Sequence, residues 1–562
     1  MTAEPTADTM AAHPQVLVVG AGPVGLVTAH ELARRGIRVR LVDAADGPAT
    51  TSRALATHAR TLEVYDQMGV LDDLLPRGQR VEHFTLHQNG RRLVRFDTDY
   101  SRLPTRFPFT LMVDQAITEE VLRAAAARHG VTVEWGVRLE EFEDHGEEVT
   151  AVLRHPGGNA EQVTAQWLVG CDGGHSTVRK QLGLQLTGTS TDTWLIADAV
   201  IDCDLPRDSI HWLRTSTGTV MMVPFPQPGK WRLLDTAEID YPDEQALAER
   251  FARKIEAGCG RAVKVHPPSW VSVFTIQQRM IPNMRSGRCF VAGDAAHVHS
   301  PASGQGMNTG VQDAVNLAWK LADVIRGGAD ESLLDSYSAE RVPVGAALLK
   351  STRMATVLVQ LRNRYAAAGL RTMFTVVRSV PPLKSKIQRK IMGGMSALDL
   401  SYAASPLTLA ATAGTDCGER AAKVTAARLD GSAGWRQLVA ELREPHWSLL
   451  AFVSPGDQGD QGGRLLRSLA DEYAGFLRVR TVGSASGNTD DDSRLGPLPD
   501  PGNHLRTDLG AVTGAWVLIR PDGYVAARGT RLAGQGPGTA MAALRAVGPR
   551  PSAVPEAAAL ER

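Results

Sequence analysis

The start of the chain alternates between short apolar runs and one stretch with helical periodicity. After a tail of small and polar residues over 1–14, the apolar run within Gln15–Gly20 predicts a buried strand. From Pro23 to Arg35 apolar residues recur at helical spacing, which predicts a helix, and Arg38–Asp43 predicts a second strand. A strand, a glycine turn, a helix and a strand in this order predict a parallel sheet with a right-handed crossover.

The middle of the chain is composed mainly of predicted strands. One further helix is expected over Gln115–His129, followed by a strand over Val131–Trp135. The alternating stretches Val149–Arg154 and Gln162–Val169 predict a hairpin around a Pro-Gly-Gly turn. Residues 192–275 are rich in strand-forming residues and turn breaks, so we expect a mostly antiparallel sheet there.

The C-terminal half begins with a predicted strand over Arg288–Gly293 and a helix over Gly310–Arg326, and helical patterns continue to about residue 395. The chain from about 405 to 545 is expected to form a separate α/β unit with apolar strands and polar loops. The expected strands are Trp447–Val453 and Ala515–Ile519, and the expected loops are Gly456–Gly463 and Gly483–Asp492. At 562 residues the chain is long enough for roughly three domains.

The composition is that of a globular protein without net charge. Lys+Arg and Asp+Glu both number 61, which weighs against binding to nucleic acid or to an anionic membrane. The five cysteines contain no CxxC pair, so neither a zinc cluster nor a redox disulfide is expected, and their scarcity favours a reducing compartment. With neither a secretory leader nor an apolar run long enough to span a membrane, the sequence predicts a cytoplasmic protein.

Gly20, Gly22 and Gly25 form a GxGxxG motif between the first strand and the first helix. The first glycine permits a tight turn, the second lets a pyrophosphate approach the backbone, and the third lets the helix pack closely on the strand. Asp43 ends the second strand, where a carboxylate can bind ribose hydroxyls. Because an acid there disfavours the 2′-phosphate of NADP, the motif predicts FAD or NAD.

Two further motifs distinguish FAD from NAD. The first is C-D-G-G-H-S-T-V-R at 171–179, and the second runs from G-D-A-A-H at 293–297 to G-Q-G-M-N at 304–308. With these motifs, and with Arg53 and Gln115 between them, the chain resembles over most of residues 15–345 the single-component flavoprotein monooxygenases of the para-hydroxybenzoate hydroxylase fold. NAD-dependent dehydrogenases do not carry the second and third motifs, so the resemblance implies FAD.

The resemblance also implies which residues hold the cofactor. Asp294 would accept hydrogen bonds from ribityl hydroxyls, and the loop before the helix would bring backbone N–H groups against the flavin ring. Arg53 and Gln115 would reach the phosphates or the flavin, and Asp172 would help to shape the FAD and NADPH clefts. The expected FAD-binding residues are Gly20, Gly22, Val24, Gly25, Asp43, Arg53, Gln115, Leu139, Asp172, Asp294, Gly304, Gly306, Met307 and Asn308.

The implied fold class is α/β, with a Rossmann-like FAD-binding domain interleaved with a mostly antiparallel substrate domain. The FAD-binding domain would cover 15–190, with a substrate-domain insertion near 80–110, and 278–395 with connecting helices; the substrate domain would cover 191–277. Residues 405–548 resemble the thioredoxin-like tail of phenol hydroxylase-type and polyketide-tailoring members. This tail lacks a CxxC, so we expect a structural or oligomeric role, and a homodimer is left open.

Some residues outside these motifs have two interpretations. His297 and His299 form an HxH pair that could imitate a metal site, but spacing pairs no further ligand with them, so no metal is expected. In the second domain we consider six candidate pocket residues, although ordinary packing is the better interpretation of each. They are His211, Trp212, Met221, Met222, Phe225 and Trp231.

The resemblance implies hydroxylation of an electron-rich phenolic ring with O₂. NADPH or NADH would reduce the flavin, which would then form a C4a-hydroperoxide with an electrophilic distal oxygen. An aromatic polyketide in antibiotic biosynthesis is the preferred substrate, followed by simple phenols. A Baeyer–Villiger oxidation, a flavin-dependent reductase and a flavin-binding protein without turnover remain alternatives, and the sequence identifies no catalytic side chain.

Overall fold

A computed structural model of the chain describes residues 13–50, 54–97, 103–299, 304–360, 396–409, 417–453, 460–483, 495–532 and 536–545, with positions 380, 382, 386, 387 and 394. The chain divides into two compact units. Unit 1 comprises Met1–Val315, Val342–Leu400 and Lys423–Asp430, and unit 2 comprises Asn316–Arg341, Ser401–Ala422 and Gly431–Arg562. The domain limits expected from the sequence remain a prediction.

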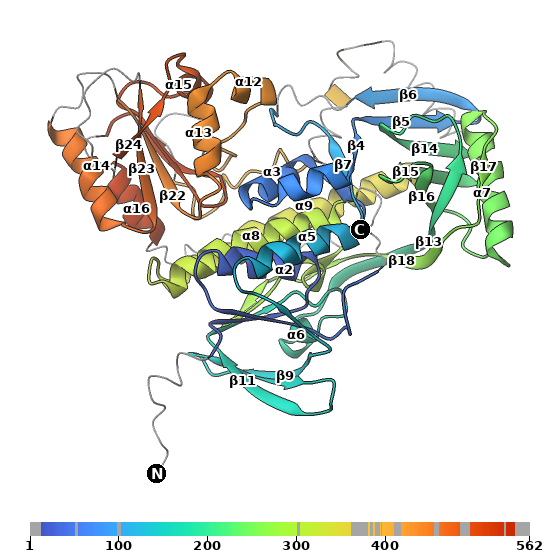
Figure 1. Cartoon of the computed structure of the whole chain (residues 1–562), viewed down its shortest axis with the longest axis horizontal. Helices are drawn as coiled ribbons and strands as arrows, with labels where there is room; N and C mark the ends of the chain where they lie inside the picture. Colours follow the sequence, from blue (N-terminus) through green and yellow to red (C-terminus); the bar gives the residue numbers. More distant parts are fainter. Residues whose placement is uncertain are drawn as a thin grey trace. The chain divides into compact units, whose positions relative to one another are not determined.

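The N-terminal pattern forms the centre of a six-stranded sheet in unit 1, in which every neighbouring pair except β19–β20 is parallel. The strand order is β19 (Arg285–Ser286), β20 (Cys289–Val291), β12 (Trp167–Gly170), β1 (Val16–Val19), β2 (Val39–Asp43) and β8 (Val133–Trp135). Strand β1 is entirely buried, as expected for a strand in the middle of a parallel sheet. Helix α2 (Pro23–Ala33) packs on β1 and β2, and α5 (Gln115–Ala127) lies beside α2 (Figure 1).

The predicted hairpin is wrong in its second strand. Strand β10 (Val149–Arg154) pairs with β9 (Arg138–Asp144) and with β11 (Ala160–Ala165) in a three-stranded antiparallel sheet. A bend at Gln166 then carries the chain into β12 of the parallel sheet. The two strands differ in burial, because β11 has one exposed face whereas β12 is buried on both, and the continuous run of strand-forming residues concealed this boundary.

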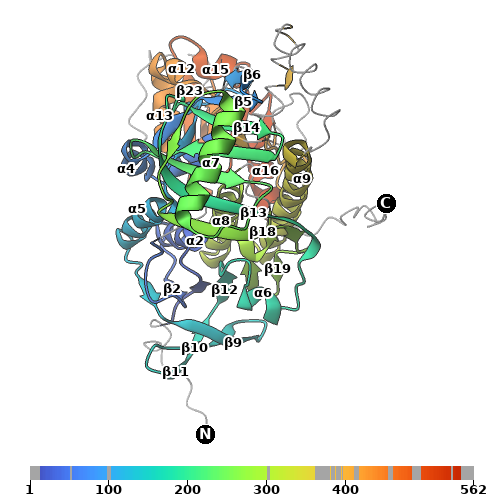
Figure 2. The ribbon, with the colours of Figure 1, turned by 90° about the vertical axis from the view of Figure 1, so that its right-hand side faces the viewer.

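A second large sheet in unit 1 contains the strands expected over 192–275, and β14–β5 is its one parallel pair. The strand order is β21 (His297–Val298), β18 (Trp270–Met280), β13 (Thr187–Asp202), β16 (Lys230–Asp235), β15 (Gly218–Pro224), β14 (Ser209–Thr215), β5 (His83–Gln88) and β6 (Arg91–Asp97), and β17 (Lys264–Val265) pairs with β13. The sequence prediction missed helix α7 (Glu244–Cys259), which lies across β14, β5 and β6 (Figure 2). Asp243 caps it by accepting from Ala246 N at 2.7 Å.

Shorter elements complete unit 1. A three-stranded antiparallel sheet has the order β3 (Ala56–Thr57), β7 (Thr110–Met112) and β4 (Gln79–Val81). The short helices are α3 (Ala59–Gln67), α4 (Leu71–Leu74), η1 (Leu75–Arg77), α6 (Thr177–Gln181), η2 (Gly293–Ala295) and α12 (Ala426–Asp430). Helix α8 (Gly306–Ile325) starts one turn before the expected Gly310, so the glycine-rich loop ends in the first turn of the helix itself.

Unit 2 is built on a five-stranded mixed sheet. Its order is β24 (Leu495–Pro499), β23 (Leu477–Gly483), β22 (Trp447–Phe452), β25 (Trp516–Ile519) and β26 (Val525–Gly529). Figure 1 shows α14 (Asp460–Glu472) and α16 (Pro537–Arg545) on one side of the sheet and α13 (Ala433–Glu441) on the other. Helix α15 (His504–Asp508) completes this part. The loop expected over Gly456–Gly463 is wrong at its end, because Asp460 already begins α14; Gly483–Asp492 lies almost wholly outside the described residues.

A fully buried cluster of charges also belongs to unit 2. Glu340, on α9 (Asp335–Gln360), accepts from Arg520 Nη1 at 2.6 Å and from Lys320 Nζ at 2.8 Å. Asp522 accepts from Arg520 Nη2 at 2.6 Å. Burial alone would raise the pKa of Glu340, but Arg520 and Lys320 outweigh it and hold that pKa far below its usual range. The cluster is therefore two cations balanced by two carboxylates.

No helix in the part of the chain that the structure describes is both long and apolar enough to cross a membrane.

Candidate active site

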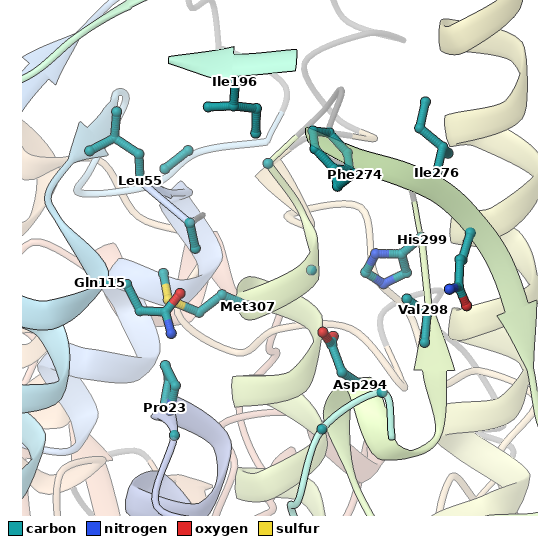
Figure 3. A pocket seen from close by; sticks show the side chains of 18 of the residues that line it. Pro23, Leu55, Gln115, Ile196, Phe274, Ile276, Asp294, Val298, His299 and Met307 are labelled. Carbon is teal, nitrogen blue, oxygen red and sulfur yellow. The ribbon is translucent and has the colours of Figure 1, made fainter. Parts of the chain in front are cut away.

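A cavity of about 530 Å³ opens in unit 1 where the glycine-rich turns meet the large second sheet. Turns that follow β1, β12 and β20 form one wall, together with the first residues of α2, α5 and α8. Figure 3 shows Pro23, Gln115, Met307 and Asp294 projecting from these segments. The expected FAD-binding residues in the lining are Gly22, Val24, Gln115, Asp294, Gly304, Gly306 and Met307.

The three glycines of the first motif occupy different environments. Gly20 has φ +102°, and a Cβ there would lie 2.5 Å from the Cys171 carbonyl oxygen. A Cβ on Gly25 would lie only 1.8 Å from the Gly20 carbonyl oxygen, so no larger residue fits this helix–strand contact. A Cβ on Gly22 would meet no atom within 4 Å, and Gly22 lines the cavity. Of the three glycines, Gly22 is therefore the one whose backbone faces the open cavity at the start of α2.

Val24 connects two of the motifs by packing. A Cβ on Gly293 would lie 2.8 Å from Val24 Cγ2, and a Cβ on Gly310 would lie 2.6 Å from the same methyl group. Glycine at both positions lets the turn after β20 and the first turns of α8 approach the start of α2. The beginnings of two helices are thus brought to the same cavity.

Asp43 lies at the end of β2 and is bonded to the first glycine-rich turn. Its Oδ2 accepts from Ala21 N at 2.6 Å and its Oδ1 accepts from Ala45 N at 2.8 Å. Each carboxylate oxygen can accept a further hydrogen bond, so Asp43 still has acceptor capacity for a ribose. Leu139 does not line the cavity; it is buried in β9, two residues after Val137, whose N–H donates to the Asp43 carbonyl at 2.9 Å.

Asp172 and Asn308 use their side chains to hold the frame of the site. Asp172 Oδ2 accepts from the N–H groups of Thr177 at 2.6 Å and Val178 at 3.2 Å, at the start of α6. Asn308 Oδ1 accepts from His58 N at 2.8 Å, and its Nδ2 donates to Ala56 O at 2.8 Å. Asn308 thereby ties α8 to β3. Direct contact of these two side chains with a cofactor stays a prediction.

Gln115 and Asp294 both project into the cavity from the ends of elements. Gln115 is the first residue of α5, and its Nε2 donates to Glu119 Oε1 at 2.8 Å. Asp294 lies in the 3₁₀ turn η2, and its side chain is exposed in the cavity. Arg53 lies outside the described residues.

The opposite wall of the cavity is apolar and comes mainly from the large second sheet. Of the six candidate pocket residues, Met221 lines the cavity, and the other five do not. The apolar lining residues of this wall are Leu55, Phe84, Met112, Ile196, Ile210, Met221, Val223, Leu234, Phe274 and Ile276. This wall also contains Arg232, which forms a bidentate ion pair with Asp198: Nε donates to Oδ1 and Nη2 donates to Oδ2, each at 2.8 Å. Such a wall favours contact with an apolar molecule.

Several polar lining residues were not identified from the sequence as pocket residues. They include His58, Arg232 and Gln277, whose positions along the chain carry no motif. His299 also lines the cavity, whereas in the sequence it was considered only as a possible metal ligand, with no metal expected. Burial, the largest cause, and the neighbouring His297 lower the pKa of His299 to about 3, although Asp313 acts in the opposite direction. Among the described residues, no three His, Cys, Asp or Glu side chains are arranged to hold a metal ion.

The residues present fit FAD. The N-cap of α2 is Gly22, which supplies no side-chain cap, so the first N–H groups of α2 are available to an anion. The positive end of a helix dipole favours a phosphate at this point. A Cβ on Gly22 would occupy the approach to these groups, and Asp43 stands at the strand end beside them.

Comparisons with known proteins agree with this fit. A family model described as FAD binding domain matches residues 13–352. The chain is 54% identical over 523 residues to 6-methylpretetramide 4-monooxygenase of Streptomyces rimosus, covering 92% of this chain and 91% of that protein. It is 33% identical to 12-dehydrotetracycline 5-monooxygenase/anhydrotetracycline 6-monooxygenase of Streptomyces rimosus subsp. rimosus, covering 91% and 94%. The solved structure of OxyS anhydrotetracycline hydroxylase from Streptomyces rimosus superposes with a TM-score of 0.68 at 29% identity, covering 92% of this chain and 96% of that chain.

The chain therefore belongs to the family defined by this FAD binding domain. It is a flavin-dependent monooxygenase, an oxidoreductase that binds FAD, takes electrons from NAD(P)H and transfers one atom of O₂ to its substrate.

Proposed function

We propose that the enzyme hydroxylates a polycyclic phenolic polyketide of the tetracycline type. The observation that carries this proposal is the 54% identity to 6-methylpretetramide 4-monooxygenase along 92% of the chain. The apolar wall formed by residues such as Phe274 and Met221 supports it, because such a surface suits a flat, fused ring system.

In this proposal the chain's own residues bind, orient and exclude water. A bound flavin would supply the electrons that activate O₂, and one atom of that O₂ would be transferred to the substrate. Gly22 and the N–H groups at the start of α2 would hold the pyrophosphate, and Asp43 a ribose. Asp294 would accept from the ribityl chain, and the first turn of α8 would place its positive end near the flavin. Of the remaining predicted FAD-binding residues, Asp172, Asn308 and Leu139 would support this site from behind its lining, and Arg53 is proposed as a further contact to the cofactor.

The apolar wall also has a chemical consequence. Water that enters such a site can consume activated oxygen without product, so a dry wall favours transfer to the substrate. The ion pair between Arg232 and Asp198 keeps the one buried guanidinium of this wall neutralised, because an unpaired buried charge would be strongly unfavourable.

We infer that the sheet of unit 2 is a thioredoxin-like domain without redox function. Its mixed sheet, with helices on both sides, is compatible with that fold. Cys417 is the only cysteine of this part of the sequence, so an internal disulfide cannot form. A cytoplasmic location and a homodimer remain predictions, and gel filtration with light scattering measures the oligomeric state.

The proposed activity is tested with FAD-loaded enzyme, NADPH, isotopically labelled O₂ and two substrates, 6-methylpretetramide and a simple phenol. We expect NADPH oxidation that depends on the polycyclic substrate, and a product that carries one labelled hydroxyl oxygen on an intact ring skeleton. A labelled lactone or its ring-opened acid would indicate Baeyer–Villiger chemistry, and product formation without O₂ would indicate a reductase. Turnover of the simple phenol alone would refute the substrate class.

A further inference from the structure

Helix α8 begins at the cavity and ends in the core of unit 2. Gly306 and Met307, in its first turn, line the cavity. Residues 306–315 of the helix belong to unit 1, whereas its remaining residues, from Asn316 to Ile325, belong to unit 2. One continuous helix therefore connects the expected flavin site with a unit to which the FAD-binding motifs give no role.

The first half of α8 is fixed by hydrogen bonds within unit 1. Asp313 is fully buried; its Oδ2 accepts from Gly293 N at 3.1 Å and lies 2.7 Å from His297 Nε2. These contacts join the helix to the turn that carries Asp294, the expected acceptor of the ribityl hydroxyls. Because Gly293 directly precedes Asp294 in the chain, any shift of α8 would be passed on to Asp294 as well as to the lining residues of the first turn.

The second half of α8 packs in the hydrophobic core of unit 2. Trp319 is fully buried in a cluster whose other described members belong to unit 2, and its ring meets that of Trp447 on β22 edge to face, with 5.4 Å between centroids and 88° between planes. The indole N–H of Trp319 donates to Asp522 Oδ2 at 3.2 Å. The indole N–H of Trp447 donates in turn to Asp323 Oδ2, on α8, at 3.0 Å. Two tryptophans and two carboxylates thus bind α8 to β22 and to the turn after β25.

Buried charges hold the same half of the helix. Asn316 Nδ2 and Lys320 Nζ, both on α8, donate to Glu340 Oε2 at 2.7 Å and 2.8 Å. Glu340 is also paired with Arg520, which follows β25, at 2.6 Å, and all four of these side chains are buried. A buried charge that loses its partner is strongly unfavourable. The helix therefore cannot slide or rotate within unit 2 without a large energetic cost.

We propose that unit 2 fixes the position of α8 and thereby sets the affinity of the enzyme for FAD. Trp447 and Asp522 do not line the cavity, so they are positioning residues that act on the cofactor through α8. Coupling of this kind is reciprocal. If unit 2 stabilises the FAD-binding position of α8, bound FAD must stabilise unit 2 by the same free energy. A unit that served only as an independent appendage would show no coupling in either direction.

The reciprocal effect can be measured in the wild-type protein by hydrogen exchange, without FAD and with saturating FAD. Strands β22 and β25 contain none of the predicted FAD-binding residues. We expect their backbone amides to exchange about tenfold more slowly when FAD is bound. Unchanged exchange in both strands would overturn the proposal.

The direct effect is measured in the full-length variants Trp447→Phe and Trp435→Phe. Trp435, on α13, is a matched control because it is also buried in unit 2 and its indole N–H donates to the carboxylate of Asp508, on α15, at 2.8 Å. This bond does not involve α8, and Trp435 lies outside the cluster that contains Trp319. We expect Trp447→Phe to bind FAD about tenfold more weakly than the wild type, and Trp435→Phe to keep wild-type affinity.

Quenching of flavin fluorescence gives the dissociation constants, and thermal melting shows how far each variant is destabilised. Wild-type FAD affinity in Trp447→Phe, or an equal loss of affinity in both variants, would overturn the proposal, because the second result would reflect general destabilisation of unit 2. If Trp447→Phe does not fold, hydrogen exchange in the wild-type protein decides between the two outcomes by itself.

Discussion

Substituting two glycines of the first motif by alanine should have opposite consequences. In Gly25→Ala the new Cβ would start 1.8 Å from the Gly20 carbonyl oxygen, whereas real contacts of this kind are at least 3.0 Å. The backbone must move by more than an ångström in a packed core, which costs about 3 kcal/mol of unfolding free energy. Gly22→Ala meets nothing within 4 Å, and its φ of −68° and ψ of −178° suit alanine. It should therefore fold as well as the wild type.

The same two variants should also differ in their affinity for FAD, and here Gly22→Ala is the variant that is impaired. The Cβ of Gly22→Ala would stand in front of the N–H groups that we expect to face the pyrophosphate. Losing one such bond to a charged group costs about 1.5–3 kcal/mol, which corresponds to a roughly 10- to 100-fold increase in the dissociation constant of FAD. The apoproteins are compared by thermal melting, and FAD affinity is measured by quenching of flavin fluorescence.

A third glycine serves as the matched control. Gly157 lies in the turn between β10 and β11, and a Cβ there also meets no atom within 4 Å. Gly157→Ala should therefore match the wild type in both measurements. The reasoning is refuted if Gly22→Ala binds FAD with wild-type affinity, or if Gly25→Ala melts at the wild-type temperature.

Four further variants test other parts of the structure. Glu340→Gln leaves two buried cations facing one carboxylate and should lower the unfolding free energy by about 3–5 kcal/mol, measured in urea, whereas the control Glu140→Gln, in an exposed ion pair, should leave the unfolding free energy nearly unchanged. Burial lowers the pKa of His30 to about 4 from 6.5, so the unfolded chain binds a proton in this range that the folded chain does not, and stability falls as pH decreases from 6.5 to 4. His30→Leu should remove about 3 kcal/mol of that acid loss, seen as a shallower dependence of melting temperature on pH; an unchanged slope would contradict it. Asp294→Ala should weaken FAD retention by about 1–3 kcal/mol because a buried hydroxyl loses its acceptor; full flavin occupancy after gel filtration would show that Asp294 is misplaced.

Much of the first sheet and of the cofactor site could be predicted because the signals are local. The run Val16–Val19 and the helical spacing after Pro23 are properties of neighbouring residues, and both elements form as expected. The glycine spacing is equally local as a signal, although the contact that requires glycine at position 20 comes from Cys171, far along the chain. The family resemblance that the three motifs carry then implied FAD.

The secondary-structure predictions were wrong where a continuous run of strand-forming residues spans two different elements. Gln162–Val169 contains β-branched and apolar residues throughout, yet the chain changes sheets at Gln166. Helix α7 was missed because its surroundings are rich in strand formers, although Leu247, Phe251 and Ile255 follow helical spacing on its buried face. Local propensity is weak compared with the burial that a tertiary fold provides.

By itself, the sequence determined the βαβ crossover and the glycine-lined turns, because these depend on backbone freedom and periodicity within a few residues, and its resemblance to a known family implied the cofactor. The tertiary structure alone decided which residues share the cavity. Arg232 and Met221 come from strands of the large sheet, whereas His299 directly follows β21, and nothing along the chain relates them. It also decided protonation, since the low pKa of His299 results from burial and from the neighbouring ring of His297. Burial depends on packing between segments far apart in the chain, so it cannot be obtained from the order of residues alone.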